Sequence, residues 1–285
     1  MKIAVVIGCL LCAAPVAAQS SHGNAFGHYK STVSSAAASS GTNAASPVSP
    51  GTGVRNFGSW LDDATVLDPG DGFVSFGFSL WKTPVYREVD LPSVDSGFAV
   101  NRKLQVGMAV PYYMASEPGG PVAHGFGDVY LNAKYQLRAP SPGKFGFGLI
   151  PMVEILSAAP PSGGSRVQWA LPVSLERQAK GWRVMGSGGY FSRGALFGAG
   201  AIEFELSKNT WATGSLSHSY STKNDELSTA LGFTRSRTDV SGGLTHALTH
   251  EIAIYGSLGR TISAHDSNSA SLIASAGVSF GVKRP

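Results

Sequence analysis

Alternation of apolar with small or polar residues is the feature that most constrains this chain. It begins at Gly72 and continues, segment after segment, almost to the C-terminus. In the first segment one face carries Val74, Phe76, Phe78 and Leu80, and the other carries Ser75, Gly77 and Ser79. Side chains alternate between the two faces of a β-strand, so this period of two indicates strands with one apolar face. The chain is therefore predicted to be all-β.

Strand length distinguishes a soluble β-sandwich from a membrane sheet. Strands in soluble domains average about 5 to 6 residues, whereas strands that cross a bilayer need about 9 to 11. Most of the alternating segments are of the longer kind. In hydrocarbon, an open sheet edge would leave backbone groups unsatisfied, at a cost of several kcal/mol each, so the sheet must close. We predict a closed, up-and-down antiparallel transmembrane β-barrel.

Connection lengths predict about twelve strands. The expected strands cover residues 72–81, 93–100, 103–113, 126–138, 144–156, 166–177, 182–191, 195–207, 210–233, 238–248, 251–262 and 269–282. Tight turns and longer links then lie on opposite ends, as in bacterial barrels with short periplasmic turns and longer external loops. Both chain ends are expected on the periplasmic side. Because 210–233 is too long for one strand, ten and fourteen strands remain alternatives.

The N-terminal 70 residues divide into two parts before the barrel, which is expected over 71–285. Residues 1–18 have Lys2, an apolar run and small residues up to Ala18, which is the pattern of a cleaved signal peptide. Residues 19–70 are low in complexity and rich in Ser, Ala, Gly and Thr, so we expect a flexible segment. The alternative is that 57–66 folds back and plugs the barrel mouth.

Composition excludes several classes of function. Both cysteines, Cys9 and Cys12, lie in the expected signal peptide, so disulfides, thiolate metal clusters and thiol catalysis are excluded from the mature chain. The chain has 22 Lys and Arg against 18 Asp and Glu, and the basic residues form no run. We therefore expect no nucleic-acid partner, no metal and no cofactor.

Charged residues within strands assign the two faces of the barrel wall. Lys134 lies in mid-strand, where facing lipid would cost about 2–4 kcal/mol, so it is expected to line the lumen. The same reasoning turns inward Asp128, Glu154, Glu176, Arg183, Glu203 and Glu205. Aromatic residues near strand ends are expected to form interfacial girdles, namely Trp81, Tyr112, Tyr135, Trp169, Trp182, Trp211 and Tyr220.

Three prolines interrupt the pattern. Pro111, Pro151 and Pro172 lie inside expected strands, where each removes a hydrogen bond from the ladder. A closed barrel has no edge strand to hold them, so we predict bulges or local breaks. A side opening through the wall is the alternative to simple irregularity.

Catalytic patterns are weak. His246, His250 and Glu251 resemble a zinc motif, but that motif requires a helix and these residues straddle a strand and a turn. His218 has serine neighbours but no acidic residue with convincing triad spacing. The chain is therefore not expected to be an enzyme.

Two neighbouring segments carry a family resemblance. Residues 104–112, LQVGMAVPY, and 125–135, GFGDVYLNAKY, resemble the outer-membrane transporter family named after the phenol meta-cleavage (MetA) degradation pathway. The resemblance extends from about Gly70 to Val282. It implies a barrel that admits small compounds, often hydrophobic or aromatic. One departure is the end of the chain, because such barrels commonly end on an aromatic residue that the assembly machinery reads, whereas here five residues follow Phe280.

Together these features predict a pore or transporter in the outer membrane of a Gram-negative bacterium, for passive passage of small compounds. The expected partners are outer-membrane lipid, the barrel assembly machinery and a small-molecule solute. A non-conducting structural or adhesive barrel is the alternative. The solute and the oligomeric state stay open.

Overall fold

The computed structural model describes residues 62–84, 87–116, 122–141, 143–157, 165–192, 194–222, 234–263, 266 and 269–282. The expected signal peptide, residues 19–61 of the low-complexity segment and the tail after Val282 lie outside the described residues. Among the described residues, no helix is long and apolar enough to cross a membrane.

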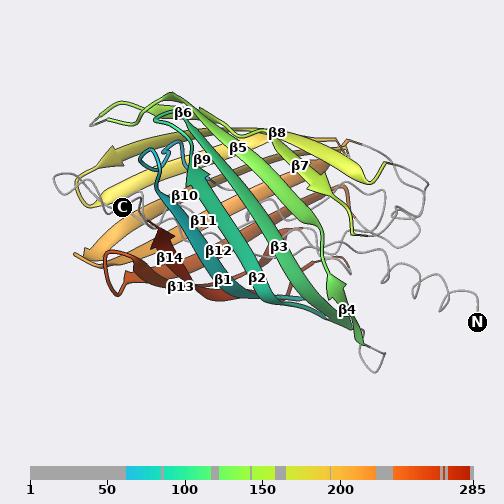
Figure 1. Ribbon diagram of the computed structural model, residues 1–285. Coiled ribbons are helices and arrows are strands. Elements are labelled where there is room, and N and C mark those ends of the chain that lie inside the picture. Colours follow the sequence, from blue (N-terminus) through green and yellow to red (C-terminus); the bar gives the residue numbers. More distant parts are fainter. Residues whose placement is uncertain are drawn as a thin grey trace, which may run out of the picture.

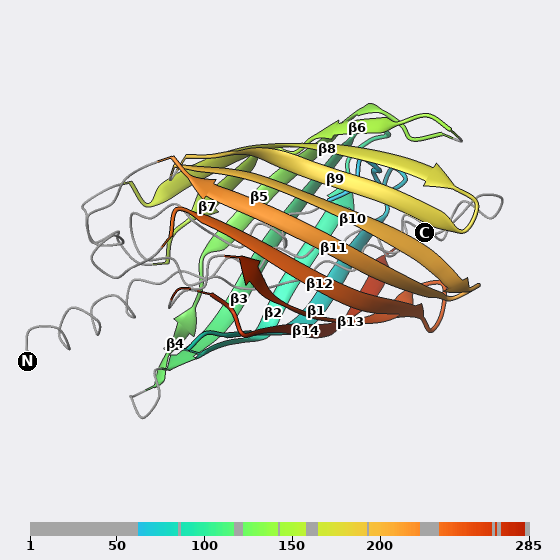
Figure 2. The same cartoon turned by 180° about the vertical axis from the view of Figure 1, so that it is seen from behind.

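Long antiparallel strands make up almost all of the described chain (Figures 1 and 2). They are β1 (Gly72–Lys82), β2 (Arg87–Ala99), β3 (Leu104–Ser116), β4 (Val122–Phe126), β5 (Val129–Arg138), β6 (Gly146–Leu149), β7 (Met152–Ile155), β8 (Val167–Ala179), β9 (Trp182–Phe191), β10 (Ala195–Ser207), β11 (Thr210–Ser221), β12 (Ser236–Ala247), β13 (Ile252–Ser263) and β14 (Leu272–Val282). All of them belong to one sheet.

The sheet closes on itself as a twelve-stranded barrel, as predicted. β1 pairs with β14, and consecutive strands pair with each other except β4 with β5 and β6 with β7. β4 and β5 both pair with β3, and β6 and β7 both lie between β5 and β8, so each of these two pairs is a single interrupted strand. Figure 1 faces β1, β2, β3 and β5, and Figure 2 faces β9 to β13.

The largest departures from the expected strand bounds concern β2 and β11. β2 begins at Arg87 instead of residue 93, because the pairing with β3 shifts register between Asp90 and Ser93, and this irregularity accommodates Pro92 inside the strand. The link after β1 is correspondingly short, residues 83–86. Within the long range 210–233, β11 ends at Ser221, and residues 223–233 lie outside the described residues.

The predicted local breaks occur in the wall beside Pro111 and Pro151, whereas the strand that carries Pro172 is unbroken. Pro151 lies in the gap between β6 and β7, and Pro111 faces the gap between β4 and β5. Pro172 lies within a continuous β8, paired in register with Gly189. A Cβ on Gly189 would lie 2.3 Å from the Leu171 carbonyl oxygen, so only glycine fits opposite this proline.

The outer face of the barrel is apolar and the inner face is polar. On β8, for example, Trp169, Leu171 and Val173 are each about half exposed, whereas Ser174 and Glu176 are completely buried. This arrangement is the reverse of a soluble core and is the pattern of a barrel surrounded by lipid.

The two ends of the barrel differ. Both the start of β1 and the end of β14 lie at one end, because Gly72 pairs with Val282. The short connections 100–103, 180–181, 208–209 and 248–251 lie at the same end. We call it the turn end, and the opposite end the loop end.

Candidate functional site: the barrel interior

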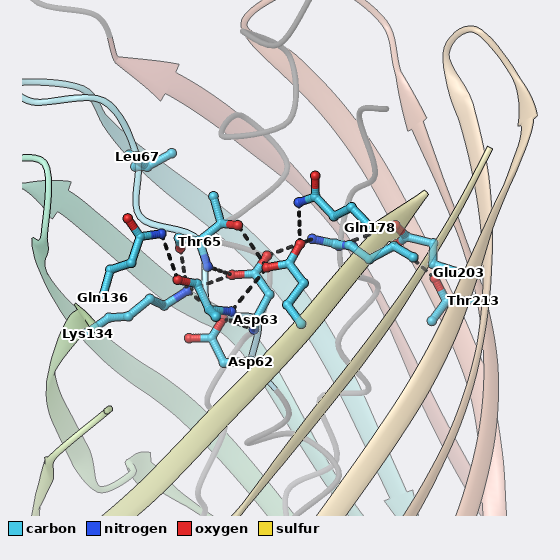
Figure 3. A network of polar contacts seen from close by, with 12 residues as sticks. Asp62, Asp63, Thr65, Leu67, Lys134, Gln136, Gln178, Glu203 and Thr213 are labelled. Carbon is cyan, nitrogen blue, oxygen red and sulfur yellow. Dashed lines mark hydrogen bonds and ion pairs between the residues drawn. The ribbon is translucent and has the colours of Figure 1, made fainter. Parts of the chain in front are cut away.

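Residues 62–67, here called the inner segment, lie inside the barrel near the turn end (Figure 3). Between them and β1 the chain turns at Asp68 to Asp71, with Asp71 N–H donating to the Asp68 carbonyl at 2.9 Å. Gly70 has φ of +87° in this turn, a conformation that favours glycine. Residues 62–66, the described part of the range whose fold-back was the alternative prediction, thus lie within the lumen.

Lys134 on β5 binds the inner segment from one side. Its Nζ donates to Asp62 Oδ1 at 2.7 Å, to Asp63 Oδ1 at 3.0 Å and to the Thr65 carbonyl at 3.1 Å. The Lys134 and Asp63 side chains are almost completely buried. Enclosure in the barrel raises the pKa of the Asp62 carboxyl, and the nearby Lys134 ammonium partly opposes this effect.

Arg183 on β9 binds the inner segment from the other side. Its Nη1 lies 2.7 Å from Asp63 Oδ2 and 3.3 Å from Glu176 Oε1, and its Nη2 lies 3.2 Å from Glu203 Oε1. Asp63 therefore bridges Lys134 and Arg183, which stand on different strands. Burying such charges is tolerable only because each has a close partner of opposite sign.

Backbone groups of the inner segment are bound by barrel side chains. Glu176 Oε2 accepts from Ala64 N–H at 3.2 Å and from Thr65 Oγ1 at 2.8 Å. Gln136 Nε2 donates to the Ala64 carbonyl at 2.9 Å, and Gln105 Oε1 accepts from Leu67 N–H at 3.2 Å. Hydrogen bonds to barrel side chains therefore hold this segment, and it is not held by pairing with a neighbouring strand.

The interior brings together four of the seven side chains predicted to line the lumen. Lys134, Glu176, Arg183 and Glu203 meet around the inner segment, and we call the inward side chains of β5, β8, β9 and β10 the charged wall. Its members Gln136 and Gln178 were not predicted as lumen residues, and neither were Asp62, Asp63 and Gln105 nearby. Gln105 and Gln136 do alternate with apolar residues in the expected strands, which is the signal that could have found them. Thr213 Oγ1 donates to Glu203 Oε2 at 3.1 Å and extends the network to β11.

The other three predicted lumen residues lie apart. Asp128 is buried and accepts from the Ser157 amide at 2.8 Å and from its hydroxyl at 3.1 Å. Glu154 is buried and accepts a hydrogen bond from Tyr130. Glu205 is exposed, since it lies two residues beyond Glu203 toward the turn that ends β10.

A second polar group lies on the inward faces of β1, β2 and β12. Ser79 Oγ donates to Asp90 Oδ2 at 2.6 Å, and Glu88 and Asp95 are buried on the same strand as Asp90. On β12, Arg237 Nε forms an ion pair with Asp239 Oδ2 at 3.2 Å. None of these charged residues was predicted from the sequence to line the lumen.

A row of short side chains lines a different arc of the barrel. Hydroxyls on adjacent strands pair across β11 to β14 and β1: Ser215 with Ser241 at 2.6 Å, Ser257 with Ser275 at 2.7 Å, and Ser75 with Ser279 at 2.6 Å. We call these six serines, with the inward Gly77 and Gly277, the hydroxyl wall. Tyr255 extends over both glycines. A Cβ on Gly77 would lie 2.9 Å from Tyr255 Oη, and a Cβ on Gly277 would lie 2.1 Å from it.

The girdle prediction was wrong for Trp81 and Trp211. Both are buried, at 0% and 4% exposure, because each shares the inward face of its strand with residues such as Ser79 and Thr213. Arg237 Cζ lies 4.8 Å from the centroid of the Trp81 ring, which is a cation–π contact inside the barrel.

The remaining predicted girdle residues lie on the outer face. Tyr135, Trp169 and Tyr220 are exposed, and Tyr112 and Trp182 are half-buried. Trp169, Tyr220 and Tyr112 lie toward the loop end, and Tyr135 and Trp182 toward the turn end. Two aromatic rims of this kind are typical of membrane barrels.

His218 and His246 lie away from the interior network. His218 is exposed on β11, with Nδ1 2.9 Å from Thr238 Oγ1, and His246 Nδ1 lies 2.9 Å from Thr210 Oγ1. In the described part of the chain, no group of three or more His, Cys, Asp or Glu residues is placed to hold a metal ion.

Comparison with known proteins supports the architecture. No protein-family model matches the chain, and no curated protein does. Among solved structures, the COG4313 outer membrane channel from Pseudomonas putida F1 has a TM-score of 0.61 at 12% identity, over 77% of this chain and 98% of that one. The NanC porin has a TM-score of 0.51 at 11% identity, over 73% and 98%. At these identities the likeness concerns the fold, and the resemblance to the MetA family stays a prediction. The chain thus has the closed barrel fold found in outer-membrane channels.

Proposed function

We propose that this protein is an outer-membrane channel of a Gram-negative bacterium, through which small solutes pass passively. The observation that carries the proposal is the inversion of the wall, with exposed apolar side chains outside and charged side chains such as Lys134 and Arg183 inside. Charges are costly to bury, and a barrel that only had to be stable would be better filled with apolar residues. A polar interior suits a path for solutes.

The strand number supports a narrow path. Barrels of about eight strands are filled by side chains, and those of about sixteen enclose water. Twelve strands lie between these limits. The inner segment occupies part of the turn end, so we place the narrowest point of the path there. Because hydrogen bonds and ion pairs to side chains hold it, its displacement would leave the barrel ladder intact.

Hydrophobic and aromatic compounds are the solutes that the MetA resemblance implies. One feature of the interior supports this class. Tyr130, Ile150, Met152, Phe191 and Phe197 form an apolar cluster on the inward faces of β5 to β10. An apolar ring could contact this cluster on its way through the barrel.

Insertion by the barrel assembly machinery is part of the proposal. Phe280 on β14 points outward, 39% exposed, and packs edge-to-face on Phe76 of β1 with ring centroids 6.3 Å apart. It therefore presents an aromatic side chain on the last strand, at the seam where the barrel closes. We propose that the assembly machinery recognises Phe280.

A non-conducting structural or adhesive barrel is the second candidate function. It is favoured by the burial of the inner segment, since Asp63 and Ala64 are completely inaccessible to solvent. A barrel whose inner segment never leaves would hold its shape and conduct nothing.

Reconstitution in planar bilayers separates the two candidates. Heat-modifiable migration on a denaturing gel first establishes that the purified chain is a folded barrel. We expect single-channel conductance and solute flux into liposomes. A folded sample that shows neither would contradict the channel and favour the structural barrel.

A further inference from the structure

The buried charges of the interior are predominantly acidic. Among the described residues, the buried carboxylates are Asp63, Glu88, Asp90, Asp95, Asp128, Glu154, Glu176, Glu203 and Asp239, and the buried cationic residues are Lys134, Arg183 and Arg237. The whole chain has the opposite balance, 22 basic against 18 acidic residues. The sign of the interior is therefore the reverse of the sign of the protein.

Basic residues that are not buried in the interior lie at the two rims of the barrel. Arg87, Arg166 and Arg235 are exposed at the loop end, and Arg138 and Lys208 are exposed at the turn end. Such positions face water and lipid headgroups, and salt screens their effect on the interior.

Each cationic side chain of the interior is close to at least one carboxylate. Lys134 lies beside Asp62 and Asp63, and Arg237 lies 3.2 Å from Asp239. Arg183 contacts three carboxylates, as described above. The positive charges are thus compensated locally, and the surplus in the interior is negative.

Two carboxylate oxygens on β2 contribute to this negative surplus and, among the described residues, accept no hydrogen bond. Within the described part of the chain, Asp90 Oδ1 and Asp95 Oδ2 have no hydrogen-bond partner, although the residues are 0% and 4% exposed. Both side chains point inward, on the same face of the strand as Glu88. Buried carboxylate oxygens of this kind need a donor or a cation to replace lost water.

We infer that the barrel interior passes cations in preference to anions, with Asp90 and Asp95 as cation-binding steps on the path. Carboxylate-lined constrictions select cations, and the low-dielectric wall of a barrel strengthens their field. This inference rests on the proposed channel function and specifies its solutes. They are positively charged or neutral, so an aromatic amine would pass more readily than an aromatic carboxylate of the same size.

The test is the reversal potential of the wild-type protein in a planar bilayer with a KCl gradient at neutral pH and low ionic strength. We expect a permeability ratio of K⁺ over Cl⁻ of about three or more, as field focusing in a charged cleft suggests. A ratio at or below one would overturn the inference and leave the channel standing. Absence of all conductance in a folded sample would instead overturn the channel, and this inference with it.

The double variant Asp90→Asn/Asp95→Asn assigns the effect to β2. We expect its permeability ratio to fall toward one while it remains a heat-modifiable barrel. Glu251→Gln is the control, because it removes the same kind of charge from an exposed turn and should leave the ratio unchanged. An unchanged ratio in the folded double variant would overturn the role of the two aspartates.

A second readout needs no variant and covers the case in which the double variant does not fold. Liposomes that contain the wild-type barrel are exposed to benzylamine or to benzoate, which are close in size and opposite in charge. Faster entry of benzylamine supports the inference, and equal or faster entry of benzoate overturns it.

Discussion

The charged wall and the hydroxyl wall solve the same problem, an inward polar face, in opposite ways. On the charged wall, long side chains such as Lys134 and Arg183 extend across the interior and bind the inner segment. On the hydroxyl wall, short side chains such as Ser257 and Ser275 satisfy one another across neighbouring strands. The first arrangement builds a binding surface for a polypeptide segment. The second satisfies polar groups in pairs between neighbouring strands.

The two walls also differ in the free energy that the loss of one partner costs. A buried ion pair that loses one partner leaves a charge without compensation, at a cost of about 3–5 kcal/mol. A neutral hydroxyl pair that loses one partner costs about 1 kcal/mol. The charged wall should therefore be sensitive to single substitutions, and the hydroxyl wall should tolerate them.

The largest effect is expected from Arg183→Met. This change leaves Asp63, Glu176 and Glu203 without their shared guanidinium, so we expect the free energy of unfolding to fall by about 3–5 kcal/mol. Urea titration of the barrel in phospholipid vesicles, followed by tryptophan fluorescence, measures it. Arg177→Met is the matched control, because Arg177 is exposed and should cost less than about 1 kcal/mol. Equal losses in the two variants would contradict the claim that the ion pairs of Arg183 in the charged wall stabilise the barrel.

The inner segment should respond next. Asp63→Asn replaces charge-assisted hydrogen bonds to Lys134 and Arg183, worth about 1.5–3 kcal/mol each, with weaker neutral ones. We expect faster amide hydrogen exchange at Ala64 and Thr65, with the exchange of β8 unchanged. Exchange that stays slow at these two amides would show that the carboxylate does not hold the segment.

On the hydroxyl wall the tightest position is Gly277. A Cβ there would lie 2.1 Å from Tyr255 Oη and 2.6 Å from the Phe76 carbonyl oxygen, so Gly277→Ala should destabilise the barrel by about 1–3 kcal/mol. Gly214→Ala on the outer face is the control, because nothing lies within 4 Å of its Cβ position. The same urea titration compares them, and a Gly277→Ala barrel as stable as the control would argue against the close approach of Tyr255.

The smallest effect is expected for the serine pairs. Ser279→Ala leaves Ser75 without its partner, so we expect a loss of about 1 kcal/mol. The double variant Ser75→Ala/Ser279→Ala removes both hydroxyls and should lose less than the sum of the single changes. A strictly additive double-mutant cycle would mean that the two hydroxyls do not interact.

Alternation and turn spacing were sufficient to predict the barrel. β9 and β10 have the predicted bounds, because an unbroken period of two and a short connection mark both ends of each strand. β2 was misplaced because Pro92 suggests a loop, whereas the register shift beside it keeps the proline inside the strand. Trp81 was misplaced because its position along the strand was considered without its face. Because Trp81 lies two residues after Ser79, it shares the face of Ser79, and this position would have turned it inward.

The site was less predictable than the fold. Mid-strand charge was a sufficient signal for Lys134, Glu176, Arg183 and Glu203, since lipid excludes such groups. Asp62 and Asp63 lie outside the alternating region and carry no periodic signal. Their role depends on contacts with residues more than seventy positions away, which only the folded chain brings together.

The position of the inner segment is the central claim, and a reversible lock tests it most directly. A Cβ on Gly148 would lie 3.5 Å from Ala64 Cα, so the pair Ala64→Cys/Gly148→Cys is close enough for a disulfide once the Ser174 hydroxyl turns aside. Both natural cysteines lie within the first eighteen residues, so the mature barrel has no competing thiol if the signal peptide is removed. Single-channel conductance is recorded before and after reduction. We predict low conductance in the oxidised barrel and a higher conductance after reduction, when the segment can leave the path. Equal conductance in the two states of a barrel shown to carry the disulfide would contradict the account.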